Sequence, residues 1–269
     1  MTKQLILRHN KTPIAVSFCY AFCMRKIVIT SGKGGVGKTT ITALLGRKLA
    51  SYGHRVVLVD GDVGLNNLDV VMGVENKVVY DVSDVLDGRC RLHQALVTDG
   101  DSGAMVLPSS SRKLDMSPQA FRGVVSSLHC DFVLIDCPAG IEEGFHRAVS
   151  SADEAIVVTT PSASAIRDAN KVVSLLSTYK LKDVGLVVNR VRYDMVRRGE
   201  MLSSKEIGTL LHLGVVGAIP EDDHVTIFQQ LGIGGEGSVS ERCAEYLAQN
   251  VENCTQNLVE PYLRRRWWR

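Results

Sequence analysis

The sequence has little of what several common classes of protein require. Its 269 residues carry a formal net charge of only +2, which argues against a nucleic-acid binder that works by bulk positive charge and leaves only a local patch for that purpose. Internal repeats and low-complexity linkers are absent. The seven cysteines form no CxxC pair and do not alternate with histidines at zinc-like spacing. Reduced, mostly buried thiols are therefore expected, rather than a disulfide framework or a metal site.

A long hydrophobic run is also missing. The apolar run Ile14–Cys23 follows three basic residues and resembles the hydrophobic region of a secretion signal, but it is too short to span a bilayer as a helix. Met24 stands two residues before the first predicted strand. Residues 1–23 are therefore interpreted as an upstream start or a loose extension without function, in preference to a targeting segment.

The remaining composition is that of an ordinary α/β protein with one large domain, since 45% of the residues are hydrophobic and 22% are charged. Short apolar runs predict strands at Lys26–Thr30, Arg55–Asp60, Ala104–Leu107, Phe132–Asp136, Ala155–Thr159, Gly185–Asn189 and Val215–Ile219. Helices are predicted at Ile41–Ala50, Ser117–Leu128, Ser164–Thr178, Ser203–Leu211 and Ser238–Asn257. Most apolar runs are continuous rather than alternating, which indicates a doubly wound, mostly parallel sheet with helices on both faces. Ligands are then expected at the carboxyl ends of the strands.

A glycine-rich segment joins the first predicted strand to the first predicted helix. The run GKGGVGKTT, from Gly32 to Thr40, satisfies the phosphate-loop pattern G-x-x-x-x-G-K-[ST]. In this context backbone N–H groups and the helix N-terminus surround phosphate, Lys38 meets the β- and γ-phosphates, and the Thr39 hydroxyl ligates Mg²⁺. An ordinary glycine-rich turn is the alternative, and the flanking strand and helix argue against it. The sequence therefore predicts nucleoside triphosphate binding.

Acidic residues fall at the ends of two predicted strands. Asp60 closes the second strand, Asp62 follows in a glycine-containing loop, and Asp136 opens the segment DCPAG. Asp60 and Asp136 are candidate Mg²⁺ ligands together with Thr39, while Asp62 is placed to orient or deprotonate the attacking water. A helix cap or turn is the alternative for any one of them. Their combination with the phosphate loop favours the catalytic interpretation.

A second lysine, Lys33, distinguishes this loop. With Lys33 and Lys38 together, the segment KGGVGKTT resembles the signature of the deviant-Walker ATPases. Within that superfamily the chain resembles the septum-site-determining MinD family from Met24 to about Gln249. The resemblance is carried by the segments VITSGKGGVGKTT, DGDVGLNNLDVVMG, VVYDVSDVLDG, DCPAGIEEG, ADEAIVVTTPSASAIRDANKV, RRGEML and GVVGAIPED. Asn66 departs from the pattern, since the family usually has a basic residue there, and this bears on partner contacts in the loop.

The resemblance implies roles for named residues. Lys33 is expected to reach the phosphates of the other subunit in a homodimer that holds ATP between its two chains. The expected catalytic residues are Lys33, Lys38 and Asp62. The expected ATP contacts are Lys33, Gly34, Gly35, Val36, Gly37, Lys38, Thr39 and Thr40 in the loop, and Asn189, Arg190, Pro220, Glu221 and Asp222 around the adenine. The segment Pro220–Asp222 is also a candidate helix start. Both interpretations can hold together.

Other members of the superfamily are alternatives. A metallocluster carrier needs cysteines at paired spacing, which Cys90, Cys130 and Cys137 lack. A ParA-like partition ATPase needs a basic DNA-facing surface, and a flagellar-number regulator needs an activating glutamine-containing N-terminal segment. A small-molecule kinase would lack Lys33. The MinD-like interpretation is preferred over all four.

The last residues combine aromatic and basic side chains. After Pro261 the candidate membrane-binding residues are Tyr262, Leu263, Arg264, Arg265, Arg266, Trp267, Trp268 and Arg269. Tyrosine and tryptophan favour the membrane interface, and each arginine near an anionic leaflet contributes about 1 kcal/mol. A frayed terminus and arginine–tryptophan stacking on nucleic acid are the alternatives. One such helix binds lipid marginally, whereas two on a dimer bind with avidity.

These inferences predict three segments: an extension over 1–23, an ATPase domain over 24–257 and an amphipathic membrane-targeting tail over 258–269. The expected function is an ATP-dependent dimerising ATPase that positions the division site, with ATP and Mg²⁺ as cofactors. The expected partners are a MinC-like division inhibitor, a MinE-like or other topological factor and anionic inner-membrane lipid, with no specific nucleic acid. The expected location is the cytoplasm and the cytoplasmic face of the cell membrane.

Overall fold

The computed structural model describes residues 24–62, 64, 67–110, 116–223, 238–256 and 258. The predicted N-terminal extension, Asn66 and nearly all of the predicted tail lie outside these residues. The strands are β1 (Arg25–Thr30), β2 (Val56–Asp60), β3 (Val97–Thr98), β4 (Met105–Leu107), β5 (Phe132–Asp136), β6 (Glu154–Thr159), β7 (Asp183–Val191) and β8 (Gly214–Pro220). The helices are α2 (Lys38–Ser51), α3 (Leu68–Val71), α4 (Val82–Leu86), α5 (Pro118–Ser126), α6 (Glu143–Ser150), α7 (Ala163–Leu176), α8 (Tyr193–Arg197), α9 (Ser204–Leu211) and α11 (Val239–Glu252).

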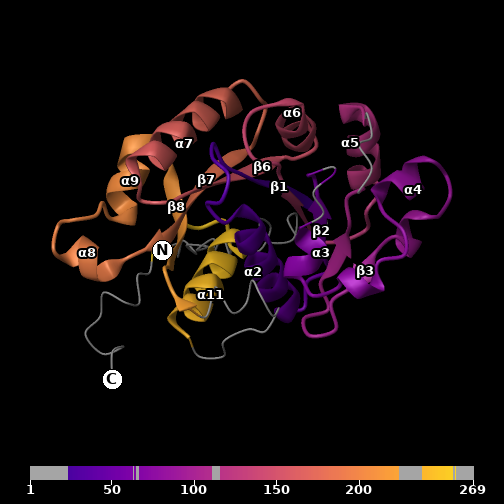
Figure 1. Cartoon of the computed structure of the whole chain (residues 1–269), viewed down its shortest axis with the longest axis horizontal. Coiled ribbons are helices and arrows are strands. Elements are labelled where there is room, and N and C mark those ends of the chain that lie inside the picture. Colours follow the sequence, from indigo (N-terminus) through magenta and orange to yellow (C-terminus); the bar gives the residue numbers. More distant parts are fainter. Residues whose placement is uncertain are drawn as a thin grey trace, which may run out of the picture.

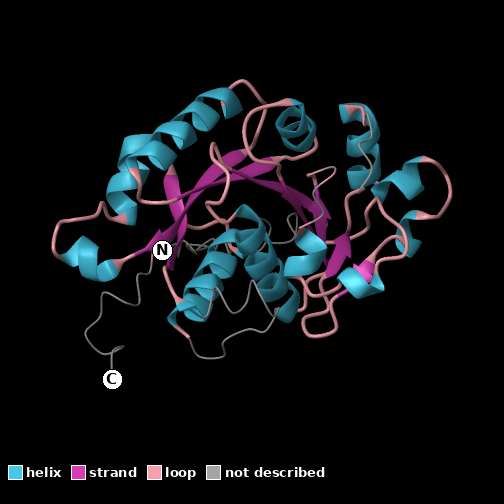
Figure 2. Ribbon diagram, in the orientation of Figure 1, coloured by secondary structure: helices cyan, strands magenta, loops and turns pink. Residues whose placement is uncertain are grey.

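The strands form a single eight-stranded sheet in the order β3-β4-β2-β5-β1-β6-β7-β8. All neighbouring pairs are parallel except β3 and β4, which are antiparallel. Helices α2 and α11 cover one face, and α5, α6, α7 and α9 cover the other (Figures 1 and 2). The prediction of a doubly wound, mostly parallel sheet is confirmed. Its order changes direction around β1, so the loops after β1, β2 and β5 meet at one edge.

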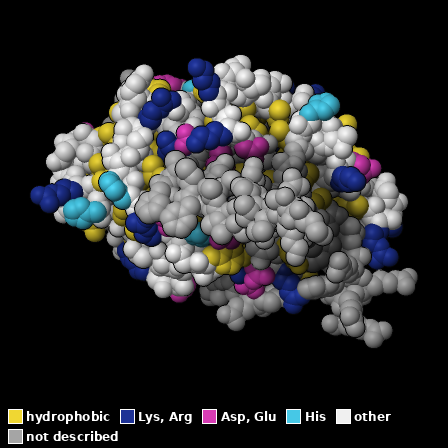
Figure 3. Space-filling model, turned by 180° about the vertical axis from the view of Figure 1, so that it is seen from behind, with side chains coloured by type: hydrophobic (Ala, Val, Ile, Leu, Met, Phe, Trp, Pro, Cys, Tyr) yellow, Lys and Arg dark blue, Asp and Glu magenta, His cyan; other side chains and the backbone are white. Residues whose placement is uncertain are grey.

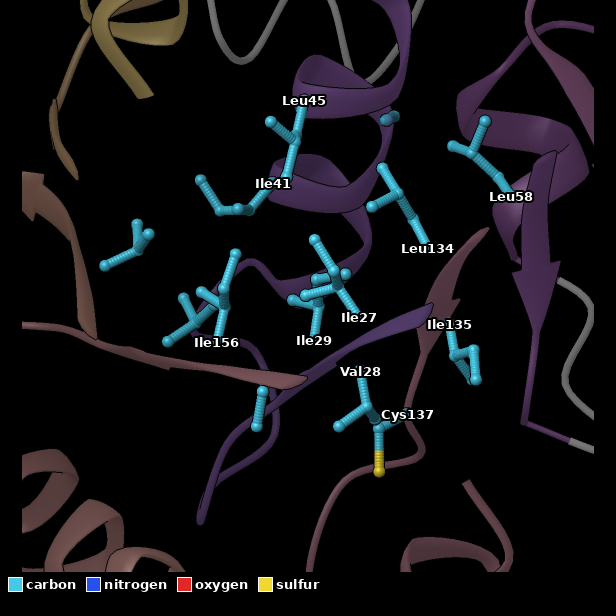
Figure 4. Packing of buried hydrophobic residues seen from close by; sticks show 14 of the residues in the cluster. Ile27, Val28, Ile29, Ile41, Leu45, Leu58, Leu134, Ile135, Cys137 and Ile156 are labelled. Carbon is cyan, nitrogen blue, oxygen red and sulfur yellow. The ribbon is translucent and has the colours of Figure 1, made fainter. Parts of the chain in front are cut away.

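The core forms because both faces of the central strands are apolar. Ile27 of β1 and Leu134 of β5 lie on the side of the sheet where Ile41 and Leu45 of α2 pack, and Val28 lies on the opposite side (Figure 4). The four-residue spacing of Ile41 and Leu45 places them on one face of α2. All five side chains are at most 1% exposed. This packing holds the first turn of α2 against the end of β1.

The predicted strands are confirmed, and each boundary lies within two residues of the predicted one. The short elements β3, α3 and α4 were not predicted. Strand β3 has two residues and α3 has four, so neither gives a periodic apolar pattern. Helix α4 is five residues long and is capped by Asp81, whose carboxylate accepts hydrogen bonds from the backbone N–H groups of Ser83 and Asp84. Such capping is visible only after the helix is known.

None of the five described cysteines forms a disulfide. Cys130, Cys137 and Cys243 are buried, Cys90 is half-buried and Cys254 is exposed. On the face seen in Figure 3, the described Lys, Arg, Asp and Glu side chains are interspersed. Among the described helices, none has both the length and the hydrophobicity needed to cross a membrane.

Candidate active site

The phosphate loop connects β1 to α2 and owes its shape to two glycines. Gly35 has φ 74° and Gly37 has φ 100°, a left-handed conformation that residues with a side chain rarely adopt. Gly37 is also the N-cap of α2, and no side chain caps the helix there. The loop contains the predicted residues Gly34, Val36, Thr39 and Thr40. Since the first backbone N–H groups of a helix have no partner within it, they are available to phosphate oxygens.

Asn189 of β7 supports the phosphate loop by a hydrogen bond to its backbone. Its Nδ2 donates a hydrogen bond of 2.8 Å to the carbonyl oxygen of Val36, and its side chain is only 3% exposed. Its Oδ1 accepts a 2.9 Å hydrogen bond from the backbone N–H of Arg190, which has φ 56°. The contacts of Asn189 therefore support the phosphate loop and the left-handed turn at Arg190. The predicted adenine contact of Asn189 stays a prediction.

Gly37→Ala is expected to damage the protein at two levels. The left-handed backbone of a non-glycine residue costs about 1–2 kcal/mol, and the new Cβ would lie 2.3 Å from Nδ2 of Asn189. Gly53→Ala is the matched control, because Gly53 has φ 91° with no atom within 4 Å of the new Cβ. We expect similar strain in both variants, with a further loss of unfolding temperature and of ATP affinity in Gly37→Ala alone. Equal thermal unfolding and equal nucleotide titrations for the two variants would contradict this account.

Two carboxylates meet beside the loop. Asp60 and Asp136 end β2 and β5 and are register partners in the sheet. Burial raises the pKa of Asp60 to about 6 and that of Asp136 to about 7, and the neighbouring charge of Asp60 adds to the effect on Asp136. Two buried carboxylates on adjacent strands repel each other when both are charged, so the arrangement favours a bound cation. The carboxylate of Asp60 accepts a 2.9 Å hydrogen bond from the backbone N–H of Asp62.

The residues fit a magnesium ion. Thr39 Oγ1 donates a 2.6 Å hydrogen bond to Asp136 Oδ2, while Asp136 Oδ1 is buried and has no hydrogen-bond partner among the described residues. A hydroxyl and two carboxylates supply the hard oxygen ligands that Mg²⁺ prefers. The structure thus brings together Thr39, Asp60 and Asp136, the three residues predicted as metal ligands. Their binding of the ion stays a prediction.

Asp62 lies half-buried on the loop that follows β2. Burial raises the pKa of its carboxyl, and the positive charges of Lys38 and Arg147 oppose that effect. Its carbonyl oxygen accepts a 2.9 Å hydrogen bond from Ser109 Oγ. The Asp62 carboxylate is near enough to Lys38 for the two charges to interact. The role of Asp62 in orienting the attacking water stays a prediction.

A pocket of about 300 Å³ opens beside the phosphate loop. It is lined by Gly35, Gly37, Lys38, Thr39, Thr40, Asn67, Val70, Val71 and Arg190. The predictions missed Asn67, Val70 and Val71, because only the short helix α3 turns them toward the loop. Val70 is 53% exposed.

The three residues Pro220, Glu221 and Asp222 lie at the end of β8 and do not line this pocket. The backbone N–H of Glu221 donates to the Val191 carbonyl at 3.1 Å, and Asp222 Oδ2 accepts a 2.8 Å hydrogen bond from Ser240 Oγ. These contacts tie the end of β8 to the end of β7 and to the start of α11. Pro220 ends β8 and Asp223 is already helical, so the segment Pro220–Asp222 directly precedes a helix.

Lys33 lies at the surface of the loop. Its Nζ is 3.2 Å from Ser164 Oγ, at the start of α7. Helix α7 approaches the loop closely, because a Cβ on Gly32 would lie 2.1 Å from the carbonyl oxygen of Asp168. An exposed lysine at this position is available to a second subunit, which is the role that the resemblance implies.

A parallel sheet with a phosphate loop after its first strand and paired acids at β2 and β5 defines a P-loop nucleotide-binding protein. The sequence profile of the CobQ/CobB/MinD/ParA nucleotide binding domain matches residues 27–231. The chain is 49% identical over 206 residues to the septum site-determining protein MinD of Bacillus subtilis (strain 168), with 74% of this chain and 77% of that protein covered. It therefore belongs to the MinD family within this group of ATPases, which confirms the resemblance carried by the phosphate loop and by the segments far from it.

Solved structures agree with this assignment. The MinC:MinD cell division protein complex of Aquifex aeolicus gives a TM-score of 0.79 at 39% identity, covering 85% of this chain and 96% of the matched chain. MinD of Pyrococcus horikoshii OT3, complexed with Mg-ADP, gives 0.78 at 32% identity, covering 86% and 97%. Membership of the family confirms the predictions of an ATPase and of ATP and Mg²⁺ as cofactors.

Proposed function

We propose that this chain is a membrane-switched ATPase that positions the cell division site by recruiting a septum inhibitor. The observation that supports it most is the juxtaposition of Thr39, Asp60 and Asp136 beside a phosphate loop with a second lysine. Together with the 49% identity to MinD of Bacillus subtilis, this arrangement supports ATP chemistry of the MinD type. The inhibitor is expected to resemble MinC, because the Aquifex aeolicus relative is a MinC:MinD complex.

The residues divide the work of hydrolysis among them. Backbone N–H groups of the loop and the ammonium group of Lys38 bind the phosphates. Thr39, Asp60 and Asp136 hold Mg²⁺, which supplies charge stabilisation for the developing negative charge when it is bound. Asp62 orients the attacking water and accepts its proton. Lys33 contacts the phosphates of the partner subunit, so that ATP holds the homodimer together and loss of the γ-phosphate releases it.

Membrane binding is assigned to the tail of residues 258–269. Helix α11 precedes it and packs on α2, the helix that begins at the phosphate loop. Lys48 Nζ of α2 lies 2.8 Å from Glu241 Oε1 and 3.3 Å from Glu245 Oε1 of α11. These ion pairs hold α11, the helix that precedes the tail, on α2, the helix that follows the phosphate loop. Two tails on one ATP dimer then bind an anionic leaflet, and a MinE-like or other topological factor triggers hydrolysis and release.

Removal of Glu260–Arg269 tests the membrane proposal. The truncated protein is expected to keep ATP-dependent dimerisation and basal hydrolysis nearly intact, because these residues lie outside the ATPase domain. Co-sedimentation with phosphatidylglycerol-containing vesicles in Mg-ATP should fall to background. Binding at the intact protein's level by the truncated chain would rule out the tail as the anchor.

Replacement of Arg264, Arg265, Arg266 and Arg269 by glutamine is the matched variant. It is expected to weaken binding mainly on anionic vesicles, and added salt should reproduce the loss for the intact protein by screening. The nucleic-acid alternative predicts a different outcome, in which truncation removes DNA or RNA retention and leaves vesicle binding unchanged.

A further inference from the structure

Arg147 is a buried arginine that has no role in the proposed mechanism. It lies on α6, which follows the loop after Asp136, and only 7% of it is exposed. Among the described residues no carboxylate lies within ion-pair distance of its guanidinium, and its buried Nε has no hydrogen-bond partner. A buried arginine that forms no ion pair is unfavourable unless its donors are hydrogen-bonded and opposite charge lies nearby, and the Asp62 carboxylate is near enough for its charge to interact with that of Arg147.

The guanidinium instead faces two backbone carbonyls, one of which belongs to the loop that carries Asp62. Its Nη2 lies 3.5 Å from the Gly61 carbonyl oxygen, and its Nη1 donates a 3.3 Å hydrogen bond to the Met116 carbonyl oxygen. Arg147 thereby bridges the loop after β2 and the residue before the N-cap of α5.

The Gly61 carbonyl belongs to the same peptide unit as the backbone N–H of Asp62. That N–H donates to Asp60 Oδ1 at 2.9 Å, so one planar peptide is held by Arg147 at its oxygen and by Asp60 at its hydrogen. A cation at the oxygen polarises the peptide and strengthens the donor at the other end. Gly61 itself is confined, because its N–H donates to the Asp136 carbonyl at 2.9 Å and a Cβ would lie 2.8 Å from that oxygen.

We propose that Arg147 is a positioning residue of the ATPase, which fixes the Gly61–Asp62 peptide and thereby the direction of the Asp62 side chain toward the attacking water. The proposal rests on the proposed function, because the role of Asp62 in hydrolysis is part of it. Arg147 does not line the pocket beside the phosphate loop. Arg147 is therefore expected to act on the rate of the chemical step and not on ATP affinity.

Arg147→Met tests this with a side chain of similar length and no charge. At saturating Mg-ATP, kcat is expected to fall about tenfold or more, since small displacements of a reacting group are costly, while the Kd for ATP stays within about twofold. Arg147→Lys keeps the charge and one donor and should recover kcat to within about threefold of the unmodified protein. The control is Arg122→Met, because Arg122 is an exposed arginine that hydrogen-bonds the Ser150 carbonyl at the end of α6 without touching the β2 loop.

Hydrogen exchange of the ADP-bound full chain separates the positioning role from simple packing. The amide of Asp62 is expected to exchange about tenfold faster in Arg147→Met, with α5 and α6 unchanged, and to be protected again in Arg147→Lys. Unchanged exchange at Asp62, or faster exchange spread over α5 and α6 without rescue by lysine, would overturn the proposal. If the unmodified protein hydrolyses no ATP, the proposed function fails, and the exchange measurement still decides whether Arg147 holds this peptide.

Discussion

Asp62→Ala is expected to lower the rate of ATP hydrolysis by about 100-fold or more, because positioned acid–base groups contribute about 10²–10⁴ to rates. The carboxylate is half-buried and feels the charge of Lys38, while its backbone N–H holds Asp60. The substitution removes the carboxylate and leaves that backbone contact in place. ATP binding should therefore survive, and the variant should accumulate as an ATP-bound dimer on membranes. Single-turnover hydrolysis and vesicle co-sedimentation measure the two effects.

Asp101→Ala is a control for loss of a surface carboxylate, since Asp101 lies at an exposed turn between β3 and β4. It should hydrolyse ATP at the unmodified rate. If Asp62→Ala hydrolyses ATP at the rate of the unmodified protein, another group positions the attacking water. Asp62→Asn adds a second comparison, because it keeps the size of the side chain and removes only the negative charge.

Lys33→Ala is expected to abolish ATP-dependent dimerisation while leaving nucleotide binding by the monomer close to normal. Lys33 is exposed, and its Nζ contacts Ser164 Oγ at 3.2 Å, so its loss should cost the fold little. A lysine that reaches the phosphates of a partner subunit contributes only when two chains meet. Light scattering with Mg-ATP, carried out in the Asp62→Ala background, measures dimerisation without loss of the dimer through hydrolysis.

Lys171→Ala serves as the control for removing an exposed lysine nearby, because Lys171 lies on α7 and pairs with Asp168 at 3.0 Å. Its dimerisation should match that of the parent. If Lys33→Ala dimerises with normal affinity in Mg-ATP, the lysine does not act across the subunit boundary. Loss of ATP binding by the monomer would instead place Lys33 in its own subunit's site.

The sequence by itself determined the parts of the protein that depend on local pattern. Continuous apolar runs predicted the central strands and the parallel sheet, because a strand buried on both faces has no polar alternation. The phosphate loop was predicted from Gly32–Thr40, since left-handed turns and close approach to phosphate both require glycine at fixed positions. Asp60 and Asp136 were predicted to lie together, because the carboxyl ends of parallel strands share one edge of the sheet.

The tertiary structure alone decided which distant residues complete this site. Asn189 hydrogen-bonds the Val36 carbonyl across 153 positions of sequence, and no local pattern indicates such a contact. Val70 and Val71 line the pocket only because a four-residue helix turns them toward the loop, and so short a helix has no periodicity to detect. No local sequence pattern around Arg147 predicts that it is buried. Its burial against the Gly61 carbonyl follows from the packing of α6 beside the end of β2, which depends on long-range contacts rather than on the residues next to it.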